Sequence, residues 1–135
     1  MKLIVMFFTL FLINFAFADE GGTHTPNFCS ASNEKVCAHL RFDTLPTSQV
    51  ANEFVLHVFS VNDTAVENVK VKLWMDMGHG HGHGSAPVSI ENLDELNHFL
   101  IGNAWFVMNG NWQVIISFTD AGVAQNIIIP IEIKN

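Results

Sequence analysis

The chain has 135 residues, of which 49% are hydrophobic, and 6 basic against 13 acidic side chains give a formal net charge of −7 at pH 7. The acidic balance argues against nucleic acid and anionic lipid as partners. The length fits one domain with a single hydrophobic core.

The first 18 residues have the pattern of a secretory signal peptide. Lys2 precedes an apolar run that ends in Ala16-Phe17-Ala18, with small residues at the two positions that a signal peptidase reads. The run is slightly short for a membrane span, so we expect cleavage and no stable membrane insertion afterwards. Retention as an anchor remains the alternative. Cleavage removes Lys2 and changes the formal net charge from −7 to −8.

Residues 19–36 are polar and form a predicted lead-in, which the cysteines tie down. Cys29 and Cys37 are the only two cysteines, and an even pair this close in an exported protein predicts a disulfide. A thiol pair for metal or redox chemistry is the alternative. The spacing matches neither a CxxC redox motif nor a zinc knuckle.

Residues 37–135 consist of short apolar runs separated by turn residues. The predicted strands are Cys37–Phe42, Phe54–Val61, Val69–Met75, Pro87–Glu91, His98–Met108, Trp112–Thr119 and Gln125–Ile133. No amphipathic helix is evident, and Asn109-Gly110 is the strongest hairpin signal. We therefore predict a single all-β domain, an immunoglobulin-like antiparallel β-sandwich of about seven strands.

Metal-binding side chains concentrate directly after the predicted strand Val69–Met75, in the sequence WMDMGHGHGHGS. In an extended chain the alternating donors share a face, and the intervening glycines do not block a bound ion. A second run ends in Met108, next to the Asn109-Gly110 turn, and Met108 either reaches the same end of the sandwich or packs in the core. The candidate metal ligands are Met75, Met77, His79, His81, His83 and Met108.

The donor types indicate which ion is preferred. Imidazole alone suits zinc, nickel and copper, whereas thioether sulfur selects copper(I). We therefore expect a copper ion, chiefly copper(I), with zinc or nickel less favoured; a flexible polar loop with incidental affinity is the alternative. Nothing resembles a nucleophile elbow, an HExxH motif or a phosphate-binding glycine loop, so the protein is not expected to be an enzyme.

The remaining histidines are weaker candidates. His39 and His57 lie inside predicted strands with apolar neighbours and are interpreted as strand residues rather than ligands. His98 begins a predicted strand near an acidic turn, and His24 lies in the lead-in. Trp74, beside Met75, either packs or covers the metal.

The stretches VKVKLWMDMGHG, HGSAPV and AWFVMNGNW together resemble the FixH-like and YtkA-like bacterial envelope domains. The resemblance covers about half of the chain after the signal peptide. It implies an immunoglobulin-like sandwich and a role in copper handling or cytochrome oxidase assembly. It favours Met75, Met77, His83 and Met108 as ligands. The lengthened HGHGHG leaves open which of the three histidines binds.

The expected function is that of a periplasmic copper carrier or chaperone that serves a cuproenzyme or an oxidase subunit. Two alternatives remain at this point. One is an assembly or interaction module for a cytochrome oxidase in which metal binding is secondary. The other is a zinc or nickel scavenger.

Overall fold

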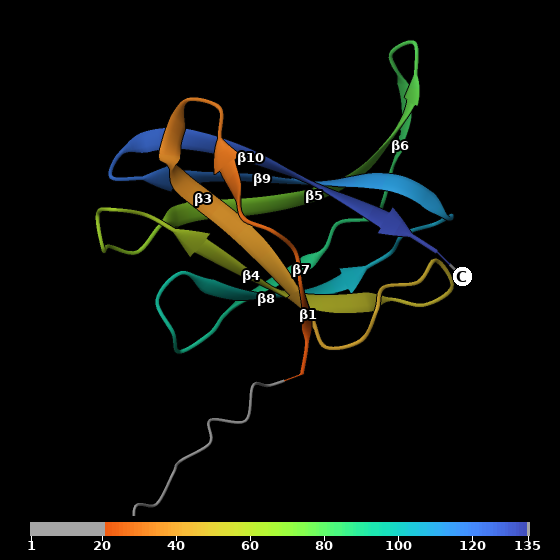
Figure 1. Cartoon of the computed structure of the whole chain (residues 1–135), viewed down its shortest axis with the longest axis horizontal. Helices are drawn as coiled ribbons and strands as arrows, with labels where there is room; N and C mark the ends of the chain where they lie inside the picture. The colour runs from red at the N-terminus through yellow and green to blue at the C-terminus, as the bar shows by residue number, and fades with distance from the viewer. Residues whose placement is uncertain (1–20, 135) are drawn as a thin grey trace, which may run out of the picture.

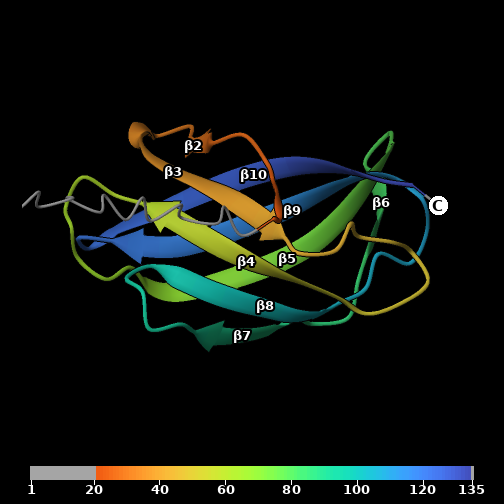
Figure 2. The same cartoon turned by 60° about the horizontal axis from the view of Figure 1, so that its bottom comes forward.

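The computed structural model describes residues 21–134, so the predicted signal peptide lies outside the described part. Two antiparallel sheets pack face to face, as Figures 1 and 2 show from two directions. The strands of the described residues are β1 (Thr23–His24), β2 (Phe28–Ser30), β3 (Asn33–Phe42), β4 (Asn52–Phe59), β5 (Glu67–Gly78), β6 (His81–Gly84), β7 (Ser89–Asn92), β8 (His98–Ala104), β9 (Gly110–Asp120) and β10 (Val123–Ile133).

The strand order confirms the predicted fold class. One sheet has the order β1-β3-β4-β8-β7, with β2 also paired to β3, and the other has the order β10-β9-β5-β6. The series β3-β4-β8-β7 and β10-β9-β5-β6 match the A-B-E-D and G-F-C-C′ orders of an immunoglobulin sandwich. All seven predicted strands are present. The short strands β1, β2 and β6 are additional.

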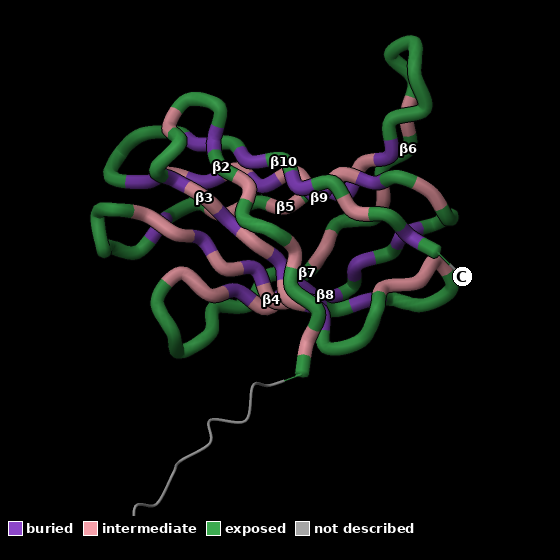
Figure 3. Tube along the Cα trace, in the orientation of Figure 1, coloured by how far each residue is buried: buried purple, intermediate pink, exposed green. Residues whose placement is uncertain are grey.

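Alternation along the long strands builds the core between the sheets. In β9 the residues Trp112, Val114, Ile116 and Phe118 are buried, and the residues between them face outward. Figure 3 shows the same alternation of buried and less buried positions along the main strands. Trp112 also meets the ring of Phe106 edge-on at 5.5 Å between ring centroids. These contacts make the sandwich a rigid support for its connections.

The described part of the lead-in is built into the sheet. Strands β1 and β2 both pair with β3, and the disulfide predicted between Cys29 and Cys37 is present. Both cysteines of the chain are therefore used structurally, in a form that fits an oxidising compartment. Residues 21–134 contain no helix that is long and apolar enough to cross a bilayer.

The prediction of a hairpin at Asn109-Gly110 is wrong. Strand β8 pairs with β4 and β7, whereas β9 pairs with β10 and β5, so the chain crosses between the sheets here. Two-residue turns with positive φ at both positions, typical of type I′ hairpins, occur instead at His79-Gly80 and Ala121-Gly122.

Three connections meet at one end of the sandwich. They are the β3–β4 loop (residues 43–51), the β5–β6 turn and the β8–β9 crossover (residues 105–109). Ser48 Oγ donates a hydrogen bond to Asn109 Oδ1 at 2.7 Å, which connects the β3–β4 loop to the β8–β9 crossover. A Cβ on Gly110 would lie 2.9 Å from Met75 Cε, so the end of β5 contacts the start of β9. This end carries the predicted metal ligands, and β6 projects from it in Figure 1.

Candidate metal centre

The histidine-glycine segment is a β-hairpin. Strands β5 and β6 pair across a turn at His79-Gly80, whose φ angles are 52° and 75°. The expectation that three histidines lie in one extended run is therefore wrong. His79 lies at the tip, and only His81 and His83 lie on the returning strand.

The register of this hairpin brings a thioether and an imidazole together. Met75 pairs directly with His83, and directly paired residues share one face of an antiparallel sheet. Between Asp76 and Gly78 the register shifts, which leaves Met77 as the extra residue of a bulge beside His81. Asp76 Oδ1 accepts a hydrogen bond from the Gly78 backbone N–H at 2.9 Å and supports this bulge.

Trp74 lies on the opposite face of the hairpin. A Cβ on Gly82 would lie only 2.3 Å from Trp74 Cζ2, so the indole ring rests directly on this glycine. Lys72 Nζ lies 4.5 Å from the ring centroid. Adjacent residues of a strand point to opposite faces, so Trp74 does not cover the face that holds Met75 and His83. It stabilises the hairpin instead.

Substitution of Gly82 tests this packing. We expect Gly82→Ala to displace the Trp74 ring, because the new methyl group would overlap both the ring and the Met75 carbonyl oxygen at 2.6 Å. Gly84→Ala is the matched control, since its Cβ would have ordinary contacts of 3.8–3.9 Å. Tryptophan fluorescence should shift to longer wavelength in the first variant only. Equal spectra for both variants would show that the indole does not rest on Gly82.

The third thioether, Met108, lies at the same end. Its carbonyl oxygen accepts a hydrogen bond from Trp112 Nε1 at 2.9 Å, which anchors the crossover to the core. Met75 is 6% exposed and packs in the core, whereas Met77 and Met108 are 55% and 37% exposed. Core packing therefore does not account for Met77 and Met108, whereas Met75 contributes to the core and is at the same time paired with His83.

The structure groups the six predicted ligands unequally. Met75 and His83 are paired, Met77 and His81 flank the neighbouring bulge, Met108 lies on the adjoining crossover, and His79 is at the exposed tip. Among residues 21–134, no three His, Cys, Asp or Glu side chains are grouped so that they could hold one metal ion. An ion at this end would therefore need thioether ligands in addition to imidazole.

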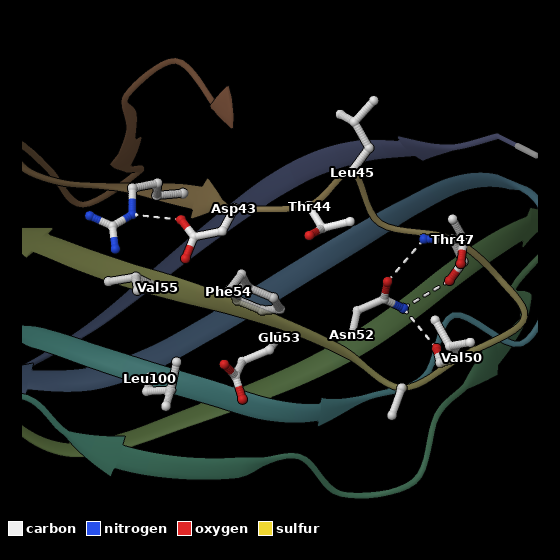
Figure 4. Close-up of a pocket in the computed structure, with 12 residues that line it drawn as sticks. Asp43, Thr44, Leu45, Thr47, Val50, Asn52, Glu53, Phe54, Val55 and Leu100 are labelled. Carbon is white, nitrogen blue, oxygen red and sulfur yellow. Dashed lines mark hydrogen bonds and ion pairs between the residues drawn. The ribbon is translucent and has the colours of Figure 1, made fainter. Parts of the chain in front are cut away.

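A separate hollow of about 380 Å³ lies between the β3–β4 loop and the start of β4 (Figure 4). Its lining includes Asp43, Leu45 and Leu100 but none of the predicted ligands. The Asn52 side chain holds the loop from within: its Nδ2 donates to three backbone carbonyls, and its Oδ1 accepts from the Thr47 N–H. The hollow is thus a by-product of loop support rather than part of the donor group.

Sequence reasoning missed a row of histidines across the outer face of the six-stranded sheet. His39 pairs with His57, and His57 pairs with His98 on the next strand. His24, on β1, lies beside His39 at 5.5 Å between ring centroids. The sequence contained one part of the signal, because His39 and His57 each stand between two residues that face the core. Their adjacency required the strand register.

The environment of this row keeps its central imidazoles neutral. Burial first, and then the neighbouring His98 and His39, lower the pKa of His57 from 6.5 to about 4. Burial also lowers the pKa of His39, with smaller contributions from His24, His98 and Arg41.

This shift predicts a loss of stability in acid. The unfolded chain binds a proton at His57 near pH 6.5 and the folded chain only near pH 4, so the unfolding free energy should fall as pH decreases between these values. Because the ring is partly solvated, we expect a loss on the order of 1–2 kcal/mol attributable to His57. Urea unfolding of metal-free protein at pH 7 and pH 4.5 measures it, and His57→Gln should show a correspondingly smaller difference. Identical pH dependence in the two proteins would contradict the lowered pKa.

In comparisons with known proteins, no family model, curated protein or solved structure matches the chain.

Proposed function

We propose that the protein is a periplasmic copper-binding carrier that holds copper(I) at the hairpin end of the sandwich. The ligands are drawn from Met75, Met77 and Met108 together with a hairpin histidine, for which His83 is the first choice. The observation that carries the proposal is the direct pairing of Met75 with His83, with two further thioethers on adjoining segments.

The chemistry of these donors supports copper over other ions. Thioether sulfur binds copper(I) and contributes little to zinc or nickel, and unlike a thiol it forms no disulfide in an oxidising compartment. Both cysteines are already joined, so thiolate ligation does not compete. The exposure of Met77 and Met108 leaves the ion accessible for transfer, which suits a carrier better than a permanent structural site.

Apolar side chains exposed at this end support a second candidate function, that of an interaction module. These exposed apolar side chains come from the β3–β4 loop, the hairpin and the crossover. They are Leu45, Val50, Met77, Trp105, Val107 and Met108. A recipient protein, such as an oxidase subunit, would dock over the same surface that presents copper. A carrier and an assembly module differ in whether docking survives loss of the metal ligands.

Competition with a chromogenic copper(I) chelator tests the proposal. Protein purified without an affinity tag should withdraw one equivalent of copper(I) from the chelator, and His83→Gln should weaken this binding while His79→Gln leaves it within about threefold. The control is reasonable because His79 lies at the tip, away from the paired thioether. If the parent protein takes no copper(I) from the chelator, the proposal is wrong. Copper(I) binding that depends on His79 instead would move the site to the tip.

A further inference from the structure

The row of histidines on the six-stranded sheet contains a pair whose geometry suits a shared ion. The rings of His39 and His57 are 5.3 Å apart between centroids and nearly perpendicular, at 89°. Two imidazoles that bind one ion at about 2.0–2.1 Å each, with a tetrahedral angle between them, place their ring centres roughly 5 Å apart. The observed spacing therefore matches that of two imidazoles that share one ion.

The ring of His39 is already oriented as a ligand. Its Nδ1 lies 3.2 Å from Asn27 Oδ1, and an amide oxygen only accepts, so Nδ1 carries the proton. The lone pair is then on Nε2, which is free to bind a metal. A hydrogen bond from the other ring nitrogen to a protein oxygen is the usual way in which metal-binding histidines are held.

His98 fixes His57 from the other side. Their rings stack at 3.8 Å between centroids with an angle of 19°, an arrangement in which the two in-plane lone pairs do not converge. The ring of His98 is directed elsewhere: Nδ1 donates to Leu96 O at 2.9 Å, and Nε2 faces Glu95 Oε2 at 3.4 Å rather than the space between His39 and His57. His98 is therefore a positioning residue and not a ligand.

The His39–His57 pair is also accessible to an incoming metal ion. His39 and His57 lie on the outward positions of β3 and β4, between the core residues Ala38 and Leu40 and the core residues Leu56 and Val58. Each ring is half-buried and reaches solvent.

We propose that His39 and His57 bind one divalent transition-metal ion, copper(II) more tightly than zinc(II), on the outer face of the six-stranded sheet. The preference follows from all-imidazole ligation, for which copper(II) exceeds zinc in affinity. Water completes the coordination, since no three His, Cys, Asp or Glu side chains of the described part converge on one point. The site is on the sheet opposite the hairpin and does not rest on the proposed copper(I) function. Together the two sites would let the protein hold both oxidation states of copper.

The test starts from a protein in which His79, His81 and His83 are all replaced by glutamine, so that hairpin imidazoles do not contribute. We expect this protein to bind one copper(II) ion, with nitrogen hyperfine splitting from two imidazoles in its electron paramagnetic resonance spectrum. Adding His39→Gln and His57→Gln should lower copper(II) affinity at least tenfold and remove the nitrogen splitting. Adding His98→Gln alone should retain a two-nitrogen spectrum.

Unfolding curves of each variant check that the sheet is intact, which outward-facing substitutions should preserve. A starting protein that binds no copper(II), or one whose copper(II) affinity is unchanged by the double substitution, would overturn the site. The starting protein lacks the hairpin histidines, so the copper(I) site is tested separately, by copper(I) titration of the parent protein and of a His39→Gln/His57→Gln variant that keeps His83. Loss of one proposed site would therefore leave the other standing.

Discussion

Replacing Met75, Met77 and Met108 together by leucine should lower copper(I) affinity at least tenfold, which corresponds to about 1.4 kcal/mol. Leucine keeps the size and apolar character of methionine but offers no sulfur. Zinc or nickel binding through the hairpin histidines should barely change, because thioethers contribute little to those ions. Parallel competition titrations with copper(I) and zinc measure both effects on one protein.

The triple variant should remain folded. Only Met75 packs in the core, and a leucine there changes volume little, so the unfolding free energy should fall by less than about 1.5 kcal/mol. The reverse set, with His79, His81 and His83 changed to glutamine, should weaken zinc binding and retain a weaker copper(I) site on the thioethers. If the leucine variant holds copper(I) as tightly as the parent, the methionines are packing residues and the imidazoles alone account for binding.

The long strands were predictable because their alternation is strict. In β5 and β9 apolar residues recur at every second position, and burial of one face leaves little choice of conformation. Strands β1, β2 and β6 were not predicted. They have two to four residues, mostly polar or glycine, and they exist because a longer neighbour pairs with them.

The turns show where strand pairing overrides the local sequence preference for a turn. Asn109-Gly110 has the composition of a type I′ turn, yet Gly110 has a φ of 134° and begins β9. Pairing β8 with β4 and β9 with β5 extends both sheets, which outweighs a local hairpin between them. His79-Gly80 forms the tight turn instead, and histidine is among the few non-glycine residues that are enriched at a positive φ such as the 52° of His79.

The two groups of histidines differ in how far the sequence specified them. The hairpin donors stand close together in the chain, so their shared end of the sandwich was predictable although their faces were not. His39 and His57 are 18 positions apart, and their contact depends on the β3–β4 register. The two groups lie on different sheets, which gives the protein one surface with soft thioether ligands and a separate surface rich in imidazole.

Asn52→Ala should lower the unfolding free energy by about 3 kcal/mol, the largest effect on stability that we expect from a single polar side chain. The Asn52 amide is buried, and its Nδ2 donates to the carbonyls of Thr47, Val50 and Ala104. Alanine leaves these carbonyls and the Thr47 N–H without the side chain that satisfies them. Asn52→Asp should be worse, since a carboxylate oxygen would then face the three carbonyls.

The Asn52→Ala substitution should also weaken copper(I) binding at the hairpin end of the sandwich. Asn52 shapes residues 43–51, and Ser48 of that loop donates to Asn109, next to Met108. Gln49→Ala is the matched control, because Gln49 is exposed on the same loop. Equilibrium urea unfolding of the three variants gives the free energies, and copper(I) titration of Asn52→Ala in the absence of urea should show weakened binding. A loss below about 1 kcal/mol would mean that water or backbone adjustment satisfies the freed groups, and the loop would then not depend on Asn52.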